Sequence, residues 1–477
     1  MPEPVENRPE AANVGALLSL LRPEVARVLD HALEGRDITV DDAISLFETT
    51  GLEYSAMVMT ADELRRRAVG DLVTYVVNRN INFTNVCIKR CGFCAFSRDF
   101  REEEGYFLPV NEIVRRAKEA WDYGATEVCI QAGLPPQMEG DLYIRLCEAI
   151  KEELPDIHIH GFSPEEVLYG AVRSRCTIRE YLEGLKAAGV GSLPGTSAEI
   201  LDQELRDEIS PGRIRVDQWV EVITTAHELG IPTTSTIMFG HVETTGHIAR
   251  HIALLRDIQQ QTGGITEFVP LSFVHTEAPM FMKELVDGVR SGPTGMDVIK
   301  VHAIARIMLN NWIPNVQASW VKEGSRMSQL LLTAGVNDLG GTLINESIST
   351  AAGAQHGQLM RPSEFREMIR QAGRIPAERY TTYQIKRVFN DDDRELDPLD
   401  FVGDNVEEVF GSYKRLVKLD TFRYEHPNRA RKSAGDDQAD SRKTEGAAQR
   451  HSIDLQAISG QPTSGQPTSG PADANPR

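Results

Sequence analysis

The chain has 477 residues, 41% of them hydrophobic and 25% charged, so it can bury one large core or several. Its formal net charge of −19 argues against a general binder of nucleic acids or of anionic membranes. It has no apolar run of roughly 18 residues and no apolar signal core near Met1, so we expect a cytoplasmic location, where its six cysteines act as metal ligands or buried thiols.

The N-terminal part of the sequence predicts a short loose segment followed by helices. Residues 1–14 are polar and contain prolines, and we expect them to be flexible. Residues 15–76 carry apolar side chains three and four positions apart, a spacing that favours amphipathic helices, and Thr39 is a suitable N-cap for one of them. We therefore interpret residues 15–76 as a helical N-terminal extension.

Residues 77–343 show another pattern, in which short apolar or β-branched runs alternate with amphipathic helices. The runs predicted to be strands are residues 81–87, 126–133, 157–162, 190–196, 232–240, 266–274, 315–321 and 337–343. Eight strands that alternate with helices over roughly 260 residues are typical of an α/β fold of the (β/α)8 TIM-barrel type. An open doubly wound sheet is the alternative.

The C-terminal part divides into a structured and a low-complexity segment. Residues 344–426 read as helices and loops, which we expect to cap or flank the barrel. Residues 427–477 include the repeat GQPTS twice, and such a composition buries too little apolar surface to offset the entropy of folding. We predict a disordered tail there.

Three cysteines, Cys87, Cys91 and Cys94, lie close together directly after the first predicted strand. A barrel carries its active-site loops at that end of its strands. Iron–sulfur clusters are held by thiolates, and a [4Fe–4S] cluster ligated by protein alone needs four, so this loop would leave one iron open. Phe93 stands between the second and third cysteines, where its ring can shield a cluster or pack on a planar ligand.

The three cysteines also allow other interpretations. A structural zinc site needs a fourth ligand, and no further Cys or His occurs between His31 and Cys129. A cluster used only for electron transfer and a chance grouping of buried thiols are further alternatives. Cys129, Cys147 and Cys176 are scattered along the chain, and we interpret them as core thiols.

The motif around these cysteines resembles a known family. The spacing CxxxCxFC after INFTNV resembles the cluster motif of the radical S-adenosylmethionine superfamily. Within that superfamily, the segments ATEVCIQAG, GIPTTSTIMFGHVET and IPNVQASWVKEG resemble the tyrosine-cleaving half of deazaflavin synthases. The resemblance covers the chain from about Asp71 to Tyr383.

This resemblance implies two cofactors, a [4Fe–4S] cluster on the three cysteines and S-adenosylmethionine at the open iron. It implies a transferase that cleaves L-tyrosine and adds its 4-hydroxybenzyl group to 5-amino-6-(D-ribitylamino)uracil, in coenzyme F-420 biosynthesis. It also implies two partners, the second radical subunit of the synthase and a one-electron reductant. An aminofutalosine-type synthase of the same branch and a non-catalytic iron–sulfur protein are the alternatives.

Two further strand ends offer residues for binding the cofactor. The second strand ends in Gln131, Ala132 and Gly133, and small residues let the backbone approach a ligand closely. The resemblance implies a Gln-Gly-Gly motif here that accepts the amino group of the cofactor's methionine part, with Ala132 in place of the middle glycine. Thr196 and Glu199 follow the fourth strand, where they either cap the next helix or, as the resemblance implies for Glu199, bind the cofactor.

Polar residues at other strands complete the predicted site. His158 and His160 alternate on the third strand and so face the same side, and we predict a catalytic role for His160, which is nearer the carboxyl end. His241 and Glu243 follow the fifth strand and form a pair suited to moving protons near pH 7. Polar groups within apolar strands need partners, and we expect three of them to face the cofactor or substrate: Gln317, Asn337 and Asp338.

Overall fold

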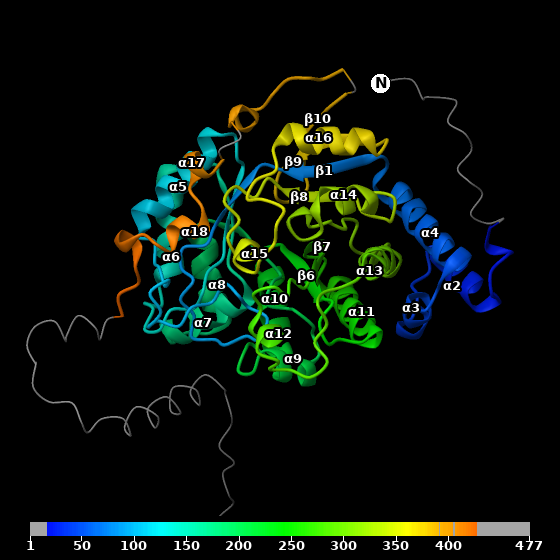
Figure 1. The fold of residues 1–477 in the computed structure, drawn as a ribbon, viewed down its shortest axis with the longest axis horizontal. Coiled ribbons are helices and arrows are strands. Elements are labelled where there is room, and N and C mark those ends of the chain that lie inside the picture. Colours follow the sequence, from blue (N-terminus) through cyan, green and yellow to red (C-terminus); the bar gives the residue numbers. More distant parts are fainter. Residues whose placement is uncertain (1–16, 391, 404–405, 427–477) are drawn as a thin grey trace, which may run out of the picture. The chain divides into compact units, whose positions relative to one another are not determined.

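The computed structural model describes residues 17–390, 392–403 and 406–426 (Figure 1). Its N-terminal part contains the helices α2 (Pro23–Leu33), α3 (Val40–Phe47) and α4 (Gly51–Val69). Thr39 caps α3, as predicted: its hydroxyl accepts the backbone N–H of Asp42, and the Asp42 carboxylate accepts the N–H of Thr39. This reciprocal bonding fixes where α3 begins.

The helical segment ends before residue 76, contrary to the prediction for residues 15–76. Gly70 ends α4 with a φ of 68°, a left-handed conformation that glycine adopts without strain. The chain then forms the strand β1 (Leu72–Val76), where β-branched Val73, Thr74 and Val76 suit an extended backbone. The first strand therefore starts inside the predicted extension, because the apolar spacing continues through the turn.

Parallel strands close into a barrel, as predicted. After β1 the barrel strands are β2 (Asn78–Ile81), β3 (Glu127–Ile130), β4 (His158–His160), β5 (Val190–Ser192), β6 (Thr233–Phe239), β7 (Ile265–Ser272) and β8 (Asp338–Gly341). β2 to β5 pair in that order, β6 pairs with β7, and β8 with β1. Parallel bridges join these groups: Leu193 to Thr233, Phe268 to Val316, Gln317 to Asp338, and Arg79 to Ile344. The pairing thus runs round a closed ring.

Helices surround this ring. The connecting helices are α5 (Val110–Asp122), α6 (Leu142–Glu153), α7 (Pro164–Ser174), α8 (Ile178–Ala187), α9 (Gln203–Ile209), α10 (Val216–Glu228), α11 (Thr245–Thr262), α12 (Pro279–Met282), α13 (Gly295–Leu309) and α14 (Trp320–Leu331). Figure 1 shows α10, α11 and α13 beside β6 and β7. The N-terminal helices pack on this layer, α3 against α11 and α4 against α13.

Two predicted strands differ from the observed ones. The first barrel strand is formed by β1 and β2, so residues 82–87 follow it as a loop. In that loop Thr84 donates its hydroxyl to the carbonyl of Tyr106 and forms an isolated antiparallel bridge with Phe107. Residues 315–321 contribute the bridges of Val316 and Gln317, and α14 already begins at Trp320.

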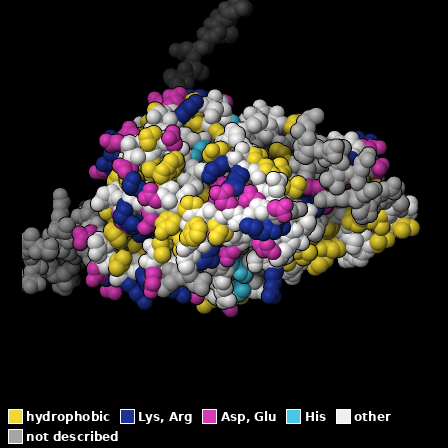
Figure 2. All heavy atoms as spheres, turned by 90° about the horizontal axis from the view of Figure 1, so that it is seen from above, with side chains coloured by type: hydrophobic (Ala, Val, Ile, Leu, Met, Phe, Trp, Pro, Cys, Tyr) yellow, Lys and Arg dark blue, Asp and Glu magenta, His cyan; other side chains and the backbone are white. Residues whose placement is uncertain are grey.

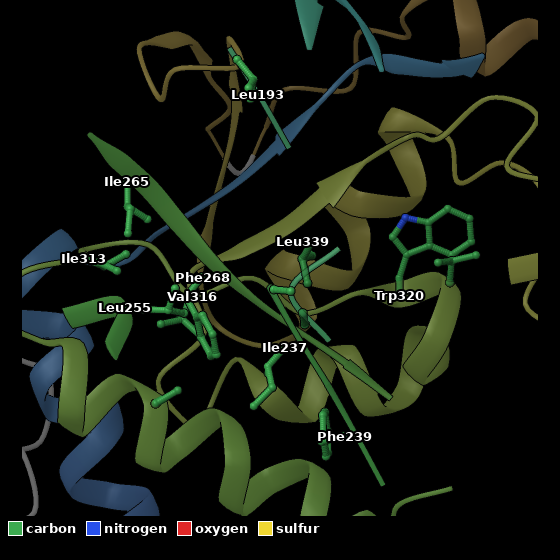
Figure 3. Packing of buried hydrophobic residues seen from close by; sticks show 14 of the residues in the cluster. Leu193, Ile237, Phe239, Leu255, Ile265, Phe268, Ile313, Val316, Trp320 and Leu339 are labelled. Atoms are coloured by element: carbon green, nitrogen blue, oxygen red, sulfur yellow. The ribbon is translucent and has the colours of Figure 1, made fainter. Parts of the chain in front are cut away.

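Alternating side chains along the strands separate the apolar core from the barrel interior. In β6, Ile237 and Phe239 are fully buried and belong to the core shown in Figure 3, together with Leu255 of α11. Successive strand residues point to opposite sides, and Thr236 and Met238 accordingly line a cavity inside the barrel. The same strand therefore stabilises the fold with one face and forms the cavity wall with the other.

Residues 344–426 contain strands as well as the predicted helices and loops. Their elements are α15 (Ile348–Ala351), α16 (Pro362–Gln371), β9 (Ile375–Arg379), β10 (Ile385–Val388), the 3-10 turns at Pro398–Phe401 and Asp420–Phe422, α17 (Val406–Phe410) and α18 (Tyr413–Leu416). β9 pairs in parallel with β1 and antiparallel with β10, so the barrel sheet continues outward. Tyr75 of β1 stacks on Phe365 of α16, with ring centroids 5.2 Å apart.

The surface and the ends of the chain complete the description. The predicted flexible segment 1–14 and the predicted tail 427–477 lie outside the described residues. Within the described ranges, none of the helices combines the length and the apolar composition needed to cross a membrane. On the face in Figure 2, Lys and Arg side chains are interspersed with Asp and Glu and form no single basic patch among the residues drawn in colour.

Candidate active site

A cavity of about 250 Å³ lies inside the barrel, at the carboxyl ends of its strands. Residues 131–134 after β3, Thr196 after β5 and residues 272–274 at the end of β7 form part of its wall. Cys87 and Cys94 line the same cavity, so the cysteine loop faces it. This is the end of a barrel at which active sites are built.

Backbone hydrogen bonds hold the cysteine loop against three other segments of the chain. The N–H of Ile88 donates to the carbonyl of Leu134 at 2.8 Å, and that of Gly92 to Ile209 at 2.9 Å. Met280 in turn donates to the carbonyl of Gly92 at 2.7 Å, and a Cβ on Gly92 would approach the Cβ of Met280 to 2.9 Å. The loop is therefore positioned by tertiary contacts, and glycine at residue 92 lets α12 approach it.

The three thiols form a donor set that fits an iron–sulfur cluster. Burial raises the pKa of Cys87 to about 11 and that of Cys91 to about 12, so a metal must displace their protons. The charge of Arg213 opposes this shift for Cys91, and the neighbouring thiols of Cys94 and Cys87 add to it. Within the described ranges, no three His, Cys, Asp or Glu side chains converge as a single metal ion requires, whereas a [4Fe–4S] cluster holds each thiolate on a separate iron.

Arg213 connects the cysteine loop to the opposite wall, and no sequence pattern predicts this role. Its Nη1 lies 3.1 Å from Cys91 Sγ, and its Nη2 donates to Ser197 Oγ at 2.8 Å. The same Nη2 lies 3.1 Å from Glu199 Oε1, and the guanidinium sits over the ring of Phe93, 5.6 Å from its centroid. Phe93, predicted to lie beside the cofactor, lines the cavity.

The segment containing Thr196 and Glu199 is a strained loop and caps no helix. Ser197 and Glu199 have φ angles of 60° and 39°, which non-glycine residues rarely adopt. The next helix, α9, begins later and is capped by Asp202, so the capping interpretation is wrong. Thr196 and Glu199 both line the cavity, and Glu199 pairs with Arg206 at 3.2 Å as well as with Arg213.

The second strand end also contributes to the cavity wall. Gln131 lines the cavity and accepts a hydrogen bond from the Thr196 hydroxyl at 3.2 Å. Gly133 is required by space, because a Cβ there would lie 2.4 Å from the carbonyl oxygen of Val86, next to Cys87. The backbone N–H of Ala132 donates to the carboxylate of Glu166 at 2.9 Å, and burial raises the pKa of that carboxyl group to about 7.

His160 lies inside the barrel, outside the residues that line the cavity. Its Nδ1 and the Nε2 of His158 are each 2.7 Å from Ser192 Oγ, so the two histidines face the same side, as predicted. Burial lowers the pKa of His160 to about 4, which leaves its ring neutral near pH 7. Its predicted catalytic role therefore needs a substrate that reaches deeper than the cavity.

His241 and Glu243 lie after β6 but away from the cavity wall. Glu243 accepts the backbone N–H groups of Gly240 and His241 and pairs with Arg290 at 2.7 Å. His241 lies with its Nε2 3.1 Å from the carbonyl of Met238, and burial lowers its pKa. Both side chains are fully buried, which suits a turn held by internal hydrogen bonds and leaves the predicted catalytic pair without access to the cavity.

Gln317, Asn337 and Asp338 have protein partners and do not line the cavity. Asp338 begins β8, at the amino end of the barrel, and pairs with Arg379 at 2.6 Å. Gln317 Nε2 lies 3.2 Å from Asp338 Oδ1, and Asn337 accepts from Arg306 at 2.7 Å. We expect a ligand because these polar groups interrupt apolar strands, but Arg379 of β9 satisfies Asp338, Arg306 of α13 satisfies Asn337, and Asp338 itself accepts from Gln317.

Comparisons with known proteins show the family of this chain. Residues 81–255 match the radical SAM superfamily, and residues 262–392 match the CofH/MqnC C-terminal region. The 5-amino-6-(D-ribitylamino)uracil–L-tyrosine 4-hydroxyphenyl transferase of Methanothermobacter thermautotrophicus is 46% identical over 76% of this chain and 98% of its own length. That of Archaeoglobus fulgidus is 49% identical over 68% and 92%. The FO synthase of Streptomyces avermitilis is 44% identical over 78% of this chain but only 43% of its own length.

Solved structures support the same fold. The hydrogenase maturase HydG from Carboxydothermus hydrogenoformans has a TM-score of 0.59 at 17% identity, covering 79% of this chain and 87% of its own. Methylornithine synthase (PylB) has a TM-score of 0.56 at 19% identity, covering 73% and 97%. At such identities the likeness concerns the barrel alone. From the sequence matches, the chain belongs to the radical SAM superfamily and, within it, to the family of 5-amino-6-(D-ribitylamino)uracil–L-tyrosine 4-hydroxyphenyl transferases.

Proposed function

We propose that this chain cleaves L-tyrosine and transfers its 4-hydroxybenzyl group to 5-amino-6-(D-ribitylamino)uracil. The observation that carries the proposal is the loop of three thiols beside a cavity lined by polar strand ends, in a chain of this transferase family. The two substrates come from the names of the relatives, and the site supplies the chemistry that such a reaction requires.

The cofactor site would be built from residues on both sides of the cavity. Cys87, Cys91 and Cys94 would hold a [4Fe–4S] cluster, and S-adenosylmethionine would complete its open iron. When bound, these groups supply a 5′-deoxyadenosyl radical. Four cofactor contacts proposed from the sequence lie in the cavity wall at the second and fourth strand ends: Gln131, Gly133, Thr196 and Glu199.

Protein side chains beside the cluster would orient the cofactor and exclude water. Glu199 and Arg213 pair at 3.1 Å and would shape the cofactor site by holding the loop after β5 against the cysteine loop. Phe93 and Phe273 cover the cavity with apolar rings, which keeps water and stray hydrogen donors from a reactive intermediate. Of the predicted contacts, those at Gln317, Asn337 and Asp338 are not part of this proposal.

Two partners belong to the proposal. The chain matches less than half the length of the Streptomyces FO synthase, so we propose that a second radical enzyme performs the other step of that synthesis. A one-electron reductant would reduce the cluster. A cytoplasmic location, expected from the composition, would provide the reducing conditions that such a cluster needs.

An anaerobic assay tests the proposal. The reconstituted enzyme is given dithionite, S-adenosylmethionine, L-tyrosine and 5-amino-6-(D-ribitylamino)uracil, and products are followed by mass spectrometry. We expect 5′-deoxyadenosine together with a hydroxybenzyl–uracil adduct. A second reaction contains an enolpyruvyl ether in place of the two substrates. If deoxyadenosine forms only in that reaction, an aminofutalosine-type synthase is favoured. Neither product from protein of verified cluster content would favour a non-catalytic iron–sulfur protein.

A further inference from the structure

One wall of the cavity carries a lysine that no described acidic residue pairs with. Lys322 lines the cavity and is partly buried, and it forms no ion pair or hydrogen bond through its side chain within the described residues. It follows the seventh barrel strand, on the first turn of α14. This position is the carboxyl end of a barrel strand, where substrate-binding residues are found.

The other charged groups of the cavity are already committed. Arg213 is held by Cys91, Ser197 and Glu199, as described above. Glu165 pairs with Lys89 at 3.2 Å and accepts the backbone N–H of Ile214 at 2.7 Å. Lys322 is therefore the cation of this cavity wall that remains available for a bound anion.

The backbone conformation around Lys322 fixes the direction in which the lysine side chain leaves α14. Its N–H donates to the carbonyl of Ser319 at 2.9 Å, so the residue is part of a formed helical turn. The turn stops at Gly324, whose φ of 74° breaks α14 and whose Cβ, if present, would lie 2.8 Å from the ring of His356. The lysine thus projects from a short turn whose backbone is held at both ends.

The two carboxylates whose charges act on Lys322 have other partners. Glu323 accepts the hydroxyl of Ser272, at the end of β7. Glu346 accepts the backbone N–H of Ser349 at 2.9 and 3.0 Å and that of Thr350 at 3.3 Å. Burial lowers the pKa of Lys322, with Glu346, Glu323 and the thiol of Cys94 opposing the shift. An ammonium group that is removed from water without a direct counter-ion favours the binding of an anion.

The surroundings of Lys322 indicate what kind of anion fits. Apolar side chains of Leu271, Phe273, Val274 and Ile348 line the same cavity. A small ligand that combines an apolar body with one carboxylate satisfies both features, and an aromatic amino acid is such a ligand. A fully polar anion would leave this apolar wall unused.

We propose that Lys322 binds the α-carboxylate of the amino-acid substrate, an inference that rests on the function proposed above. By holding that carboxylate, Lys322 would fix the Cα–Cβ bond of L-tyrosine relative to the cofactor. It is a substrate-positioning residue, and the same contact would distinguish an amino acid from its decarboxylated or amidated analogue.

The test compares two ligands and four proteins. L-tyrosine and L-tyrosinamide, whose carboxylate is replaced by a neutral amide, are titrated into the cluster-loaded enzyme with S-adenosylmethionine and without reductant. The proteins are the parent, K322M and K322R, with K418M as the control because Lys418 is exposed. We expect the parent to bind L-tyrosine roughly 10- to 100-fold more tightly than tyrosinamide, as for a hydrogen bond to a charged group. K322M should bind the two ligands equally, K322R should retain part of the preference, and K418M all of it.

Three results would overturn the assignment. K322M that retains the full preference for L-tyrosine excludes a contact with the carboxylate. Equal loss of both ligands, with iron content and melting temperature unchanged, indicates a general effect on the cavity. Loss of S-adenosylmethionine binding instead assigns Lys322 to the cofactor. If K322M loads no cluster, the test rests on K322R. Its preference for L-tyrosine over L-tyrosinamide should then be smaller than that of the parent. In each case adduct formation by the parent enzyme tests the proposed function separately.

Discussion

The guanidinium of Arg213 lies 3.1 Å from the sulfur of Cys91, although 122 positions separate the two residues in the sequence. The contact joins the cysteine loop after β2 to the segment between α9 and α10. Through Glu199 and Ser197, Arg213 also holds the strained loop after β5. One side chain therefore connects the cysteine loop with the opposite wall of the cavity.

Replacing Arg213 by lysine should weaken the cofactor site without removing a cluster ligand. Lysine keeps the positive charge but cannot contact Cys91, Ser197 and Glu199 together, because it lacks the planar fork of arginine. We expect R213K to load a cluster and to bind S-adenosylmethionine about 10- to 100-fold more weakly, measured by iron content and equilibrium dialysis. R215K, with its change on an exposed neighbouring arginine, should behave like the parent. Parental affinity in R213K would show that Arg213 does not shape the cofactor site.

Loss of one cluster thiol should abolish cluster binding, whereas loss of a core thiol should not. C91A removes one of the three proposed ligands, and we expect iron and sulfide to fall to background after reconstitution. C147A removes a fully buried thiol of α6, and we expect full cluster content with a free energy of unfolding lower by about 1 kcal/mol. Visible absorption and iron analysis measure both. A cluster of normal content in C91A would contradict the assigned ligands.

Replacing Gly133 by alanine should disturb the cysteine loop, although residue 133 is not part of that loop. The new Cβ would lie 2.4 Å from the carbonyl oxygen of Val86, so the backbone beside Cys87 must move. We expect G133A to lower the free energy of unfolding by about 1–3 kcal/mol and to reduce iron content. G403A is the control, because nothing lies within 4 Å of a Cβ at that position. Equal iron content in the two variants would argue against this close approach.

Stability should fall on mild acidification, in part because of His251. Its Nδ1 accepts the N–H of Leu201, its Nε2 donates to the carbonyl of Thr236, and burial lowers its pKa to about 3. The unfolded chain takes up this proton near the ordinary pKa of 6.5, so the contribution is complete above pH 6.5 and is lost toward pH 3.

We therefore expect His251 to lower the free energy of unfolding by about 2 kcal/mol between pH 7 and pH 5. Urea unfolding of the parent and of H251Q at these two pH values measures this contribution. H251Q should be less stable at pH 7 but should lose about 2 kcal/mol less on acidification. An identical loss in both proteins would show that His251 does not couple folding to protons.

Local patterns predicted those parts of the molecule that depend on neighbours in the sequence. The capping of α3 by Thr39 follows from residues three positions apart, and the strand–helix alternation of the barrel follows from periodicity. The end of α4 was missed because the apolar spacing runs on past Gly70 into β1. Periodicity reports which side chains are apolar, whereas the turn is set by the backbone of a single glycine.

Contacts across the barrel could not be predicted from the sequence in the same way. Asp338 was expected at the cavity because it is polar, but strand register places it at the amino end, beside Arg379. Arg213 lies in a polar turn that resembles any surface loop, and only the closed barrel brings it to Cys91. The residues that complete such a site are close in space and distant in sequence.

Transfer of an isotope tests the central claim most directly. L-tyrosine carrying ¹³C in all ring positions is supplied to the cluster-loaded enzyme with reductant, S-adenosylmethionine and 5-amino-6-(D-ribitylamino)uracil. We predict a uracil adduct that contains the complete labelled ring, formed together with 5′-deoxyadenosine by the parent enzyme and absent in C91A. Deoxyadenosine formed without label in any uracil product would contradict the claim that this barrel transfers the tyrosine side chain.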